Sequence, residues 1–463
     1  MIENVLASRY VSPEILKIFE KKNRIILERS FWVSVMKLQM KYGLPITLKE
    51  IEAYEKVIGE IDLNSLNLRE KTLKHDVKAK IEEFNSLANV QKIHLGMTSR
   101  DLTDNIELIQ IKLSLDFIVD KCLLILKLLD EKINAYSSLL ISARTHNQVA
   151  QLTTLGKKFA DCAGEFLDAF INLETIIENF RFRGIRGAVG NNQDLSNLID
   201  FKDIESLNDD LAQVFGFNKK YVSIGQIYPR SFDFKLISGF AQIGAAPSSF
   251  ATSLRIMSGF DLMHEGFSEQ QVGSSAMPHK KNPKNSERLN GLYLLLTGYA
   301  NIAASLSGKQ WNEGDVSCSV VRRVIIPDSI FALDGLLNTF IVILRDFQIN
   351  EKKIREEIEE ELINLYSSAY VMLLAKKGIG REDSHKMIKT SIELCDKNVE
   401  IFNNKIMLQS EGKISKSDIK KMMAKVDDIS SNSKNICVAM SSEINKVLGN
   451  KSFDLSNLLV TEI

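Results

Sequence analysis

The sequence predicts an all-α protein built around a central bundle of long helices, and three observations carry this prediction. Only 7 of the 463 residues are proline, far below the average usage of about 5%. Apolar residues recur every three or four positions from Phe159 to Phe180, a seam typical of helices packed nearly parallel. The uncharged stretches 236–254 and 289–308 are long, and no series of short β-branched runs separated by turns suggests a sandwich or a βαβ fold.

The two uncharged stretches are long enough to cross a bilayer, but the polar residues within them argue against it. We expect deeply buried helices instead, apolar nearly all round because neighbours cover every face and possibly shared between subunits. Residues 106–135 contain no helix breaker, and their length predicts a helix although four apolar residues alternate as in a strand. Near the N-terminus, residues 41–50 predict a turn followed by a helix capped by Thr47.

Three domains are expected from the positions of turn-forming segments and from a shift in composition. They are an N-terminal helical domain (1–97), a central helical bundle (98–349) and a C-terminal helical domain (350–463). The last begins where the composition shifts to charged amphipathic helices.

Charge and cysteine usage exclude several classes of protein. The 59 basic and 59 acidic residues balance, so no global positive field attracts a nucleic-acid backbone. The five cysteines form no CxxC pair and are too sparse for a disulfide framework, which indicates reduced thiols and a cytoplasmic protein. The N-terminus carries an acidic residue and no apolar core of a secretory signal.

Motifs for metals and nucleotides are missing from the sequence. The six histidines include no HExxH and no pair spaced for zinc, so no metal is expected. The sequence contains no complete P-loop, no GxGxxG and no GxSxG elbow. We therefore expect an enzyme without a cofactor, if the chain is an enzyme.

The segment GSSAMPHKKNP at 273–283 is the sharpest feature of the sequence. Composition alone favours a solvated basic loop, although loops on rigid scaffolds often carry chemistry. The segment fits the pattern GSSxMPxKxNP at every fixed position and closely resembles the signature of the fumarase/aspartase superfamily. This resemblance implies β-elimination with release of fumarate, an all-helical three-domain fold, and a homotetramer whose active sites combine residues of three subunits.

Four further segments resemble the adenylosuccinate lyase branch of this superfamily. They are SRYVSPE at 8–14, KHDVKA at 74–79, IHLGMTSRDLTDN at 93–105 and RTHNQVAQLTTLGKK at 144–158. The resemblance extends from about residue 6 to about residue 340 and implies cleavage of adenylosuccinate to AMP and fumarate, and of SAICAR to AICAR. Another fumarate-releasing lyase, or a non-catalytic scaffold on the same fold, remains the alternative.

The sequence alone also suggests roles for two of the candidate positions, without reference to the family. Thr98 and Asp101 form a capping-box pattern, and a capped helix N-terminus is also an anion site. His146 is expected at a helix start, either as a satisfied core histidine or as an acid.

The resemblance implies roles for the catalytic residues. His146 would be the general acid and Ser274 the base, with Ser275 as the alternative base. Lys280 and Asn282 would hold the substrate carboxylate, and Glu287 would orient His146 or its neighbours.

The resemblance also implies a set of substrate-binding residues, of which Arg288, Ser319 and Arg323 would hold the 5′-phosphate. The full set is Arg9, Tyr10, Lys74, His75, Asp76, His94, Thr98, Ser99, Thr145, Gln226, Asn282, Arg288, Ser319 and Arg323. Many family members have an arginine where this chain has Gly314. The sequence offers Arg230 and Arg322 as replacements without deciding between them.

Overall fold

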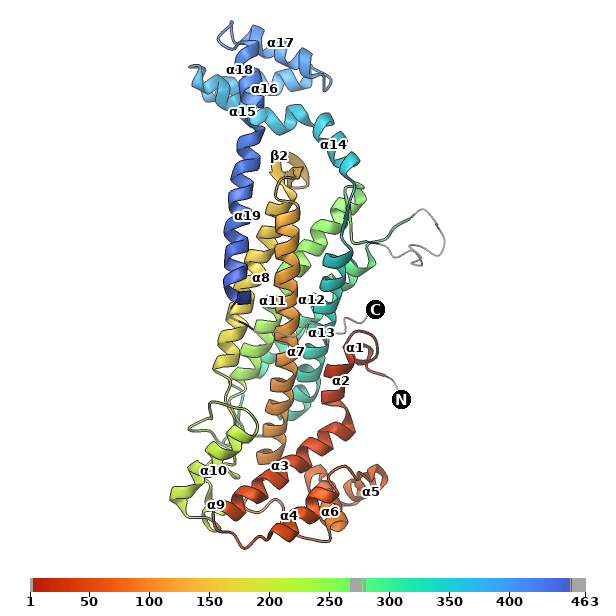
Figure 1. The fold of residues 1–463 in the computed structure, drawn as a ribbon, viewed down its shortest axis with the longest axis vertical. Helices are drawn as coiled ribbons and strands as arrows, with labels where there is room; N and C mark the ends of the chain where they lie inside the picture. Colours follow the sequence, from red (N-terminus) through yellow and green to blue (C-terminus); the bar gives the residue numbers. More distant parts are fainter. Residues whose placement is uncertain (1–2, 267–276, 278–279, 316, 450, 452–463) are drawn as a thin grey trace.

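Long helices form the body of the molecule and run side by side along its longest dimension (Figure 1). The computed structural model describes residues 3–266, 277, 280–315, 317–449 and 451, and the structural statements below refer to these residues. The bundle helices are α7 (Ser99–Ala135), α8 (Leu155–Glu178), α11 (Ser231–Gly259), α12 (Lys284–Leu306) and α13 (Ser317–Asp346). The predicted all-α long-helix bundle is confirmed.

The apolar seam predicted from the sequence lies on α8. Phe159, Ala163, Phe166, Phe170 and Leu173 are all fully buried, where α8 packs against α7, α11 and the last helix of the chain. Residues three and four positions apart share one face of a helix, so this spacing places these five residues in the core, while Ile177 of the predicted seam is partly buried. The helix ends at Glu178, just before the last seam residue.

The uncharged stretches form α11 and α12, but one chain does not cover α12 on every side. Leu294 is 69% exposed, Leu295 42% and Ile302 44%, so α12 presents an apolar face to solvent. On the following helix, Val320 and Val324 are also exposed. One chain alone therefore does not cover α12 on every side, and the expectation that its core is shared between subunits stays a prediction.

Helix α13 is the described helix that has the length and hydropathy to cross a membrane. In the structure, 83% of its apolar window is buried inside the protein, among the other bundle helices. This burial is typical of a core helix.

Helices also form the N-terminal part of the chain, beside and below the lower part of the bundle in Figure 1. They are α1 (Val5–Arg9), α2 (Pro13–Phe19), α3 (Lys21–Lys41), α4 (Leu48–Lys56), α5 (Leu63–Leu73) and α6 (Asp76–Ala88). Thr47 and Glu50 form the capping box of α4, as predicted. Helix α3 packs against α7, and α1 packs against α13.

Near this end, α9 (Gln193–Ser196) and α10 (Phe201–Val214) lie in the connection between α8 and α11. The loop at 183–192 precedes them, and α10 packs against α3.

At the other end, the C-terminal helices form a second apolar cluster around Tyr366, Tyr370 and Phe402. These helices are α14 (Glu351–Glu360), α15 (Leu362–Lys376), α16 (Arg381–Glu393), α17 (Val399–Gln409) and α18 (Lys416–Met423). Helix α19 (Val426–Gly449) then returns along α7 and α8, and its Cys437 and Ile444 are buried in the bundle core.

A β-hairpin joins α7 to α8, where the sequence analysis expected a helix start. Strand β1 (Leu140–Thr145) pairs antiparallel with β2 (Gln148–Thr154). His146 and Asn147 form the turn with φ angles of 51° and 61°. Two consecutive left-handed residues are typical of the tight turns that join paired strands. A second small pairing joins β3 (Met263–His264) to β4 (Gln348–Ile349).

Candidate active site

The predicted site residues lie in three separate groups within one chain. The helix-start group surrounds the first turn of α7 and contains Lys74, His75, Asp76, His94, Thr98, Ser99, Gln226, Ser319 and Arg323. The hairpin group contains Thr145 and His146. The α12 group contains Lys280, Asn282, Glu287 and Arg288, together with Arg9 and Tyr10.

Helix α7 separates the first two groups by most of the length of the bundle (Figure 1). Its 37 residues span about 55 Å at about 1.5 Å per residue. The helix-start group lies at its first turn and the hairpin group just beyond its last. A single copy of the chain therefore cannot bring Ser99 and His146 to one small ligand.

In the helix-start group, Thr98 caps α7 and Asp101 completes the predicted capping box. The Thr98 amide donates a hydrogen bond to Asp101 Oδ2 over 2.7 Å. Ser99 Oγ lies 3.4 Å from His75 Nε2, so a hydroxyl and an imidazole meet at the positive end of a long helix dipole. This arrangement suits a carboxylate or another anion.

The segment that carries Lys74, His75 and Asp76 lies at the junction of α5 and α6. Lys74 adopts a left-handed conformation with φ 54°, which ends α5. His75 caps α6 by accepting a hydrogen bond from the Lys78 amide at Nδ1. Asp76 Oδ2 lies 3.6 Å from Nη2 of Arg323, whose side chain is 64% exposed. The structure thus brings α6, α7 and α13 together at this group.

His94 has a defined protonation state within the same group. Trp32 Nε1 donates to His94 Nδ1 over 3.1 Å, and an indole nitrogen can only donate. The proton of the neutral ring must then lie on Nε2. Burial lowers the pKa of His94 to about 4, opposed by the nearby charge of Asp101. His94 is consequently a neutral hydrogen-bond donor at physiological pH.

In the hairpin group, Thr145 and His146 are exposed at the tip of the turn. The strand beneath them is held by Arg144, whose guanidinium lies 4.2 Å from the ring centroid of Phe260 and pairs with Glu357. The strand that leads into the turn is therefore fixed in place, although the predicted acid, His146, projects from the surface.

In the α12 group, Lys280 and Glu287 are exposed and Asn282 is half-buried. Arg288 lies 5.8 Å from the ring centroid of Tyr10, which places the predicted nucleotide residues of α1 beside the start of α12. Arg9 is exposed at the end of α1. The predicted base Ser274 and its alternative Ser275 lie outside the described residues.

Glu265 belongs to this region, and the sequence analysis did not select it. Its buried carboxylate accepts hydrogen bonds of 2.8 Å from the amides of Asn285 and Ser286 and from the Ser286 hydroxyl. A carboxylate at a helix N-terminus is stabilised by the helix dipole. Glu265 thereby anchors the start of α12 to the segment after β3. An acid just before the loop that precedes α12 was the only sequence signal for this role.

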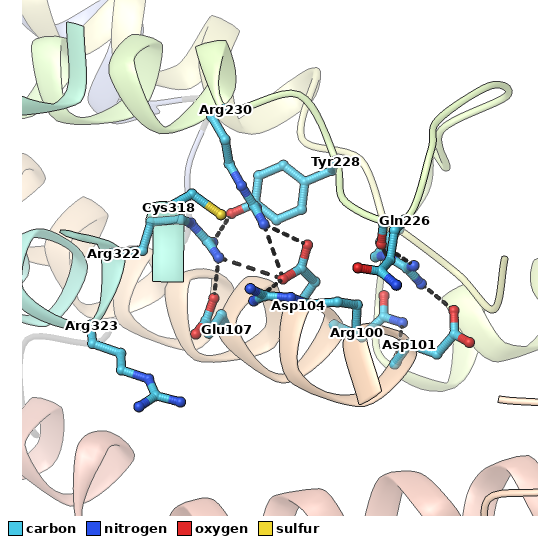
Figure 2. A network of polar contacts seen from close by, with 12 residues as sticks. Arg100, Asp101, Asp104, Glu107, Gln226, Tyr228, Arg230, Cys318, Arg322 and Arg323 are labelled. Carbon is cyan, nitrogen blue, oxygen red and sulfur yellow. Dashed lines mark hydrogen bonds and ion pairs between the residues drawn. The ribbon is translucent and has the colours of Figure 1, made fainter. Parts of the chain in front are cut away.

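A buried ion network lies behind the helix-start group (Figure 2). Asp104 Oδ2 accepts from Arg230 Nη2 over 3.0 Å, and Arg322 Nη1 lies 3.5 Å from Asp104 Oδ1. Burial favours the neutral acid, but Arg230 and Arg322 outweigh it and hold the pKa of Asp104 below its ordinary value. Arg322 also pairs with Glu107 and Asp233.

Arg230 and Arg322 are therefore not available as replacement phosphate ligands. Both are 1% exposed, and their charges are balanced by acids of α7 and α11. Arg323, the next residue along α13, faces the other way and remains exposed (Figure 2).

Gly314 adopts φ +150°, a backbone conformation that residues with a side chain rarely take. A Cβ atom at this position would lie 3.3 Å from Cγ1 of Ile227. The position is thus adapted to glycine in both backbone and space, and the space that an arginine would occupy first is filled by Ile227.

Comparisons with known proteins identify the family. Residues 20–297 match the sequence profile of the Lyase family. The adenylosuccinate lyase of Schistosoma mansoni is 30% identical over 393 residues, covering 83% of this chain and 82% of that protein. The adenylosuccinate lyase of Saccharomyces cerevisiae is 30% identical over 391 residues, covering 83% and 81%.

Solved structures agree with this fold. The 3-carboxy-cis,cis-muconate lactonizing enzyme from Pseudomonas putida superimposes with a TM-score of 0.83 at 16% identity, covering 96% of this chain and 99% of the other. A fumarate lyase from Mesorhizobium sp. BNC1 gives a TM-score of 0.77 at the same identity and coverage. On the sequence matches, the chain belongs to the adenylosuccinate lyase family of the fumarase/aspartase superfamily.

Proposed function

We propose that the chain is a C–N lyase that cleaves adenylosuccinate to AMP and fumarate, and SAICAR to AICAR and fumarate, in purine nucleotide synthesis. The observation that carries the proposal is the helix-start group. It combines the N-terminus of α7, the Ser99–His75 contact and the exposed Arg323 in one place. These groups suit a substrate with a carboxylate and a phosphate. Family membership supports the same substrates.

The reaction requires a base, an acid and a site for the negative charge that develops on the substrate. In our proposal Ser274, or Ser275 in its place, removes the proton next to a succinyl carboxylate while Lys280 and Asn282 hold that carboxylate. The C–N bond then breaks, and His146 donates a proton to the departing nitrogen. General acid–base steps of this kind commonly contribute about 10²–10⁴-fold to the rate.

The remaining groups bind and orient. Thr98 and Ser99 bind the other carboxylate at the start of α7, and Glu287 orients His146 from another chain. The predicted nucleotide contacts come from all three groups: Arg9, Tyr10, Lys74, His75, Asp76, His94, Thr145, Gln226, Arg288, Ser319 and Arg323. No cofactor takes part in the proposed reaction.

We further propose a homotetramer in which each active site takes the three groups from different subunits. Two observations support this assembly. The helix-start and hairpin groups lie at opposite ends of a helix of about 55 Å. The exposed apolar face of α12 needs a partner, because large exposed apolar patches usually mark interaction surfaces. A second copy of the chain can supply both the cover and the missing group.

A cytoplasmic location also belongs to this proposal. The five cysteines are free and buried, as expected for a protein kept in a reducing compartment.

The first experiment is a spectrophotometric assay of the purified chain with adenylosuccinate, SAICAR, argininosuccinate, aspartate and malate. We expect turnover of the first two substrates only. Turnover of argininosuccinate, aspartate or malate in place of adenylosuccinate would assign the chain to another lyase activity, and no turnover of any would favour a scaffold.

The shared site is tested by mixing two inactive variants, His146→Ala and Ser274→Ala. Reassembled tetramers should regain part of the activity, because some sites receive both intact residues. Exchange of subunits is followed by native mass spectrometry. If subunits exchange and no activity returns, the sites are not shared.

A further inference from the structure

We propose that Asp101 and Arg183 form a positioning pair that fixes the substrate-binding start of α7 relative to Gln226. The pair touches no substrate itself and acts through the segments that it joins. This inference rests on the proposed function, since Thr98, Ser99 and Gln226 matter here as substrate contacts.

The Asp101 carboxylate joins two segments of the chain. It has no exposed surface and accepts the Thr98 amide at 2.7 Å, the Arg186 amide at 2.8 Å and the Gly187 amide at 3.2 Å. The guanidinium of Arg183 donates to it as well. A buried carboxylate with this many N–H donors has little freedom to move, because each lost bond leaves an unsatisfied charge. The first turn of α7 is thereby locked to the loop at 183–187.

Arg183 extends the connection to Gln226. Its side chain is fully buried, and its Nε donates to the Gln226 carbonyl over 3.2 Å, with a second bond to the same oxygen from Nη2. A further bond of 2.9 Å reaches the Gly184 carbonyl. One planar guanidinium thus bridges the Asp101 carboxylate and the Gln226 carbonyl.

The backbone of Gln226 is also held at its amide. Its amide donates to the Glu313 carbonyl over 2.9 Å, next to Gly314. The peptide groups on both sides of the Gln226 Cα atom are thus engaged, one through its N–H and the other through its C=O, so the backbone of Gln226 and the direction of its Cα–Cβ bond are restrained. The segments that bear Thr98 and Gln226 therefore form one rigid unit, although they are far apart in sequence.

Arg186 provides a matched control in the same loop. Its guanidinium is also buried and also bridges a carboxylate and a carbonyl, those of Glu205 and Tyr221. None of its side-chain partners is a predicted substrate residue. Arg183→Lys and Arg186→Lys both keep the charge and lose the planar fork, so both should lower the melting temperature.

The kinetics with adenylosuccinate distinguish positioning from simple support of the fold. We expect Arg183→Lys to lower kcat/KM at least tenfold, mainly through KM, at a temperature where circular dichroism shows a folded protein. Small displacements of binding groups carry costs of this size. Arg186→Lys should leave kcat/KM within about twofold. Equal losses in the two variants would overturn the proposal.

A double-mutant cycle with Gln226→Ala tests the route of the effect. If Arg183 acts through Gln226, Arg183→Lys should cost clearly less in the Gln226→Ala background than in the wild type. Additive losses would also overturn the proposal. If Arg183→Lys does not fold, Asp101→Asn replaces it in the same cycle with the same criteria. A wild-type chain without lyase activity would contradict the proposed function instead.

Discussion

The two ends of α7 differ in how they hold their predicted site residues. At the start of the helix, hydrogen bonds of Asp101 and Arg183 lock the surrounding segments in place. At the far end, His146 projects from an exposed two-residue turn. The residues at the start of α7 are held by contacts within a single chain, whereas the His146 side chain at the far end is exposed. We expect this difference if the start of α7 binds the substrate within one chain and His146 belongs to the active site of another chain.

The largest effect should come from the exposed end. His146→Ala should lower kcat by at least about 10²-fold, because a general acid is worth roughly 10²–10⁴-fold. The melting temperature should fall only slightly, because the side chain is exposed and the main cost is the strain of alanine at a φ of 51°. His385→Ala, an exposed histidine on α16, is the control for both measurements. Near-normal turnover of the His146→Ala variant would show that His146 is not the general acid.

The pH dependence of the free energy of unfolding tests the buried surroundings of His94, near the start of α7. The pKa of His94 is about 4 in the folded chain against 6.5 for a free histidine. As pH falls below 6.5, the unfolded chain binds a proton that the folded chain does not, so the free energy of unfolding decreases until pH reaches about 4. The loss amounts to about 3 kcal/mol.

The variant His94→Asn should lack this pH-dependent component, and asparagine tolerates the positive φ of 66° at this position. Urea denaturation of both proteins from pH 7.5 to 4.5 measures the difference, with His385→Asn as the control. Parallel pH curves for wild type and His94→Asn would mean that His94 is not held neutral by burial.

Arg323 tests whether the helix-start group binds phosphate. Removing it should weaken productive binding by about 1.5–3 kcal/mol, the usual worth of a hydrogen bond to a charged group. At about 1.4 kcal/mol per decade this corresponds to roughly 10- to 150-fold in KM. Arg323 is largely exposed and pairs with Asp76 alone among the contacts described, so Arg323→Ala should fold normally. An equal loss with the dephosphorylated substrate would rule out the phosphate contact.

The smallest expected effect concerns Gly314. Introducing the family arginine, Gly314→Arg, should destabilise the chain by about 1–3 kcal/mol through backbone strain and contact with Ile227, without tightening substrate binding. Gly59→Arg is the control, because its φ is not positive and a Cβ there meets nothing within 4 Å. Thermal denaturation and KM for adenylosuccinate measure both consequences. A lower KM would show that position 314 still faces the phosphate.

The sequence predicted the helices because their signals are local. The seam from Phe159 needs only the period of a helix, and the capping boxes at Thr47 and Thr98 need only four residues. The hairpin was missed because its strands follow a long helix, and only Asn147 hinted at a left-handed turn.

The sequence predicted which residues form the candidate site, but not that they lie in three separate groups within one chain. Arg230 and Arg322 looked like free cations in the sequence, since their partner Asp104 lies more than a hundred residues away. Arg183, which the sequence analysis did not select, likewise reaches Asp101 across 82 positions. Contacts of this range depend on the packing of α7, α11 and α13, which no local pattern encodes.

The length of α7 sets the distance between the helix-start and hairpin groups. Deleting one heptad would keep the buried face of the helix turned inward, within about 20°. The same deletion would shorten the distance between the two ends by about 10 Å. In a symmetric tetramer that error would recur in every site at once. A chain shortened by one heptad between Ser99 and the hairpin should therefore still fold, but it should lose activity if the proposed shared site is correct.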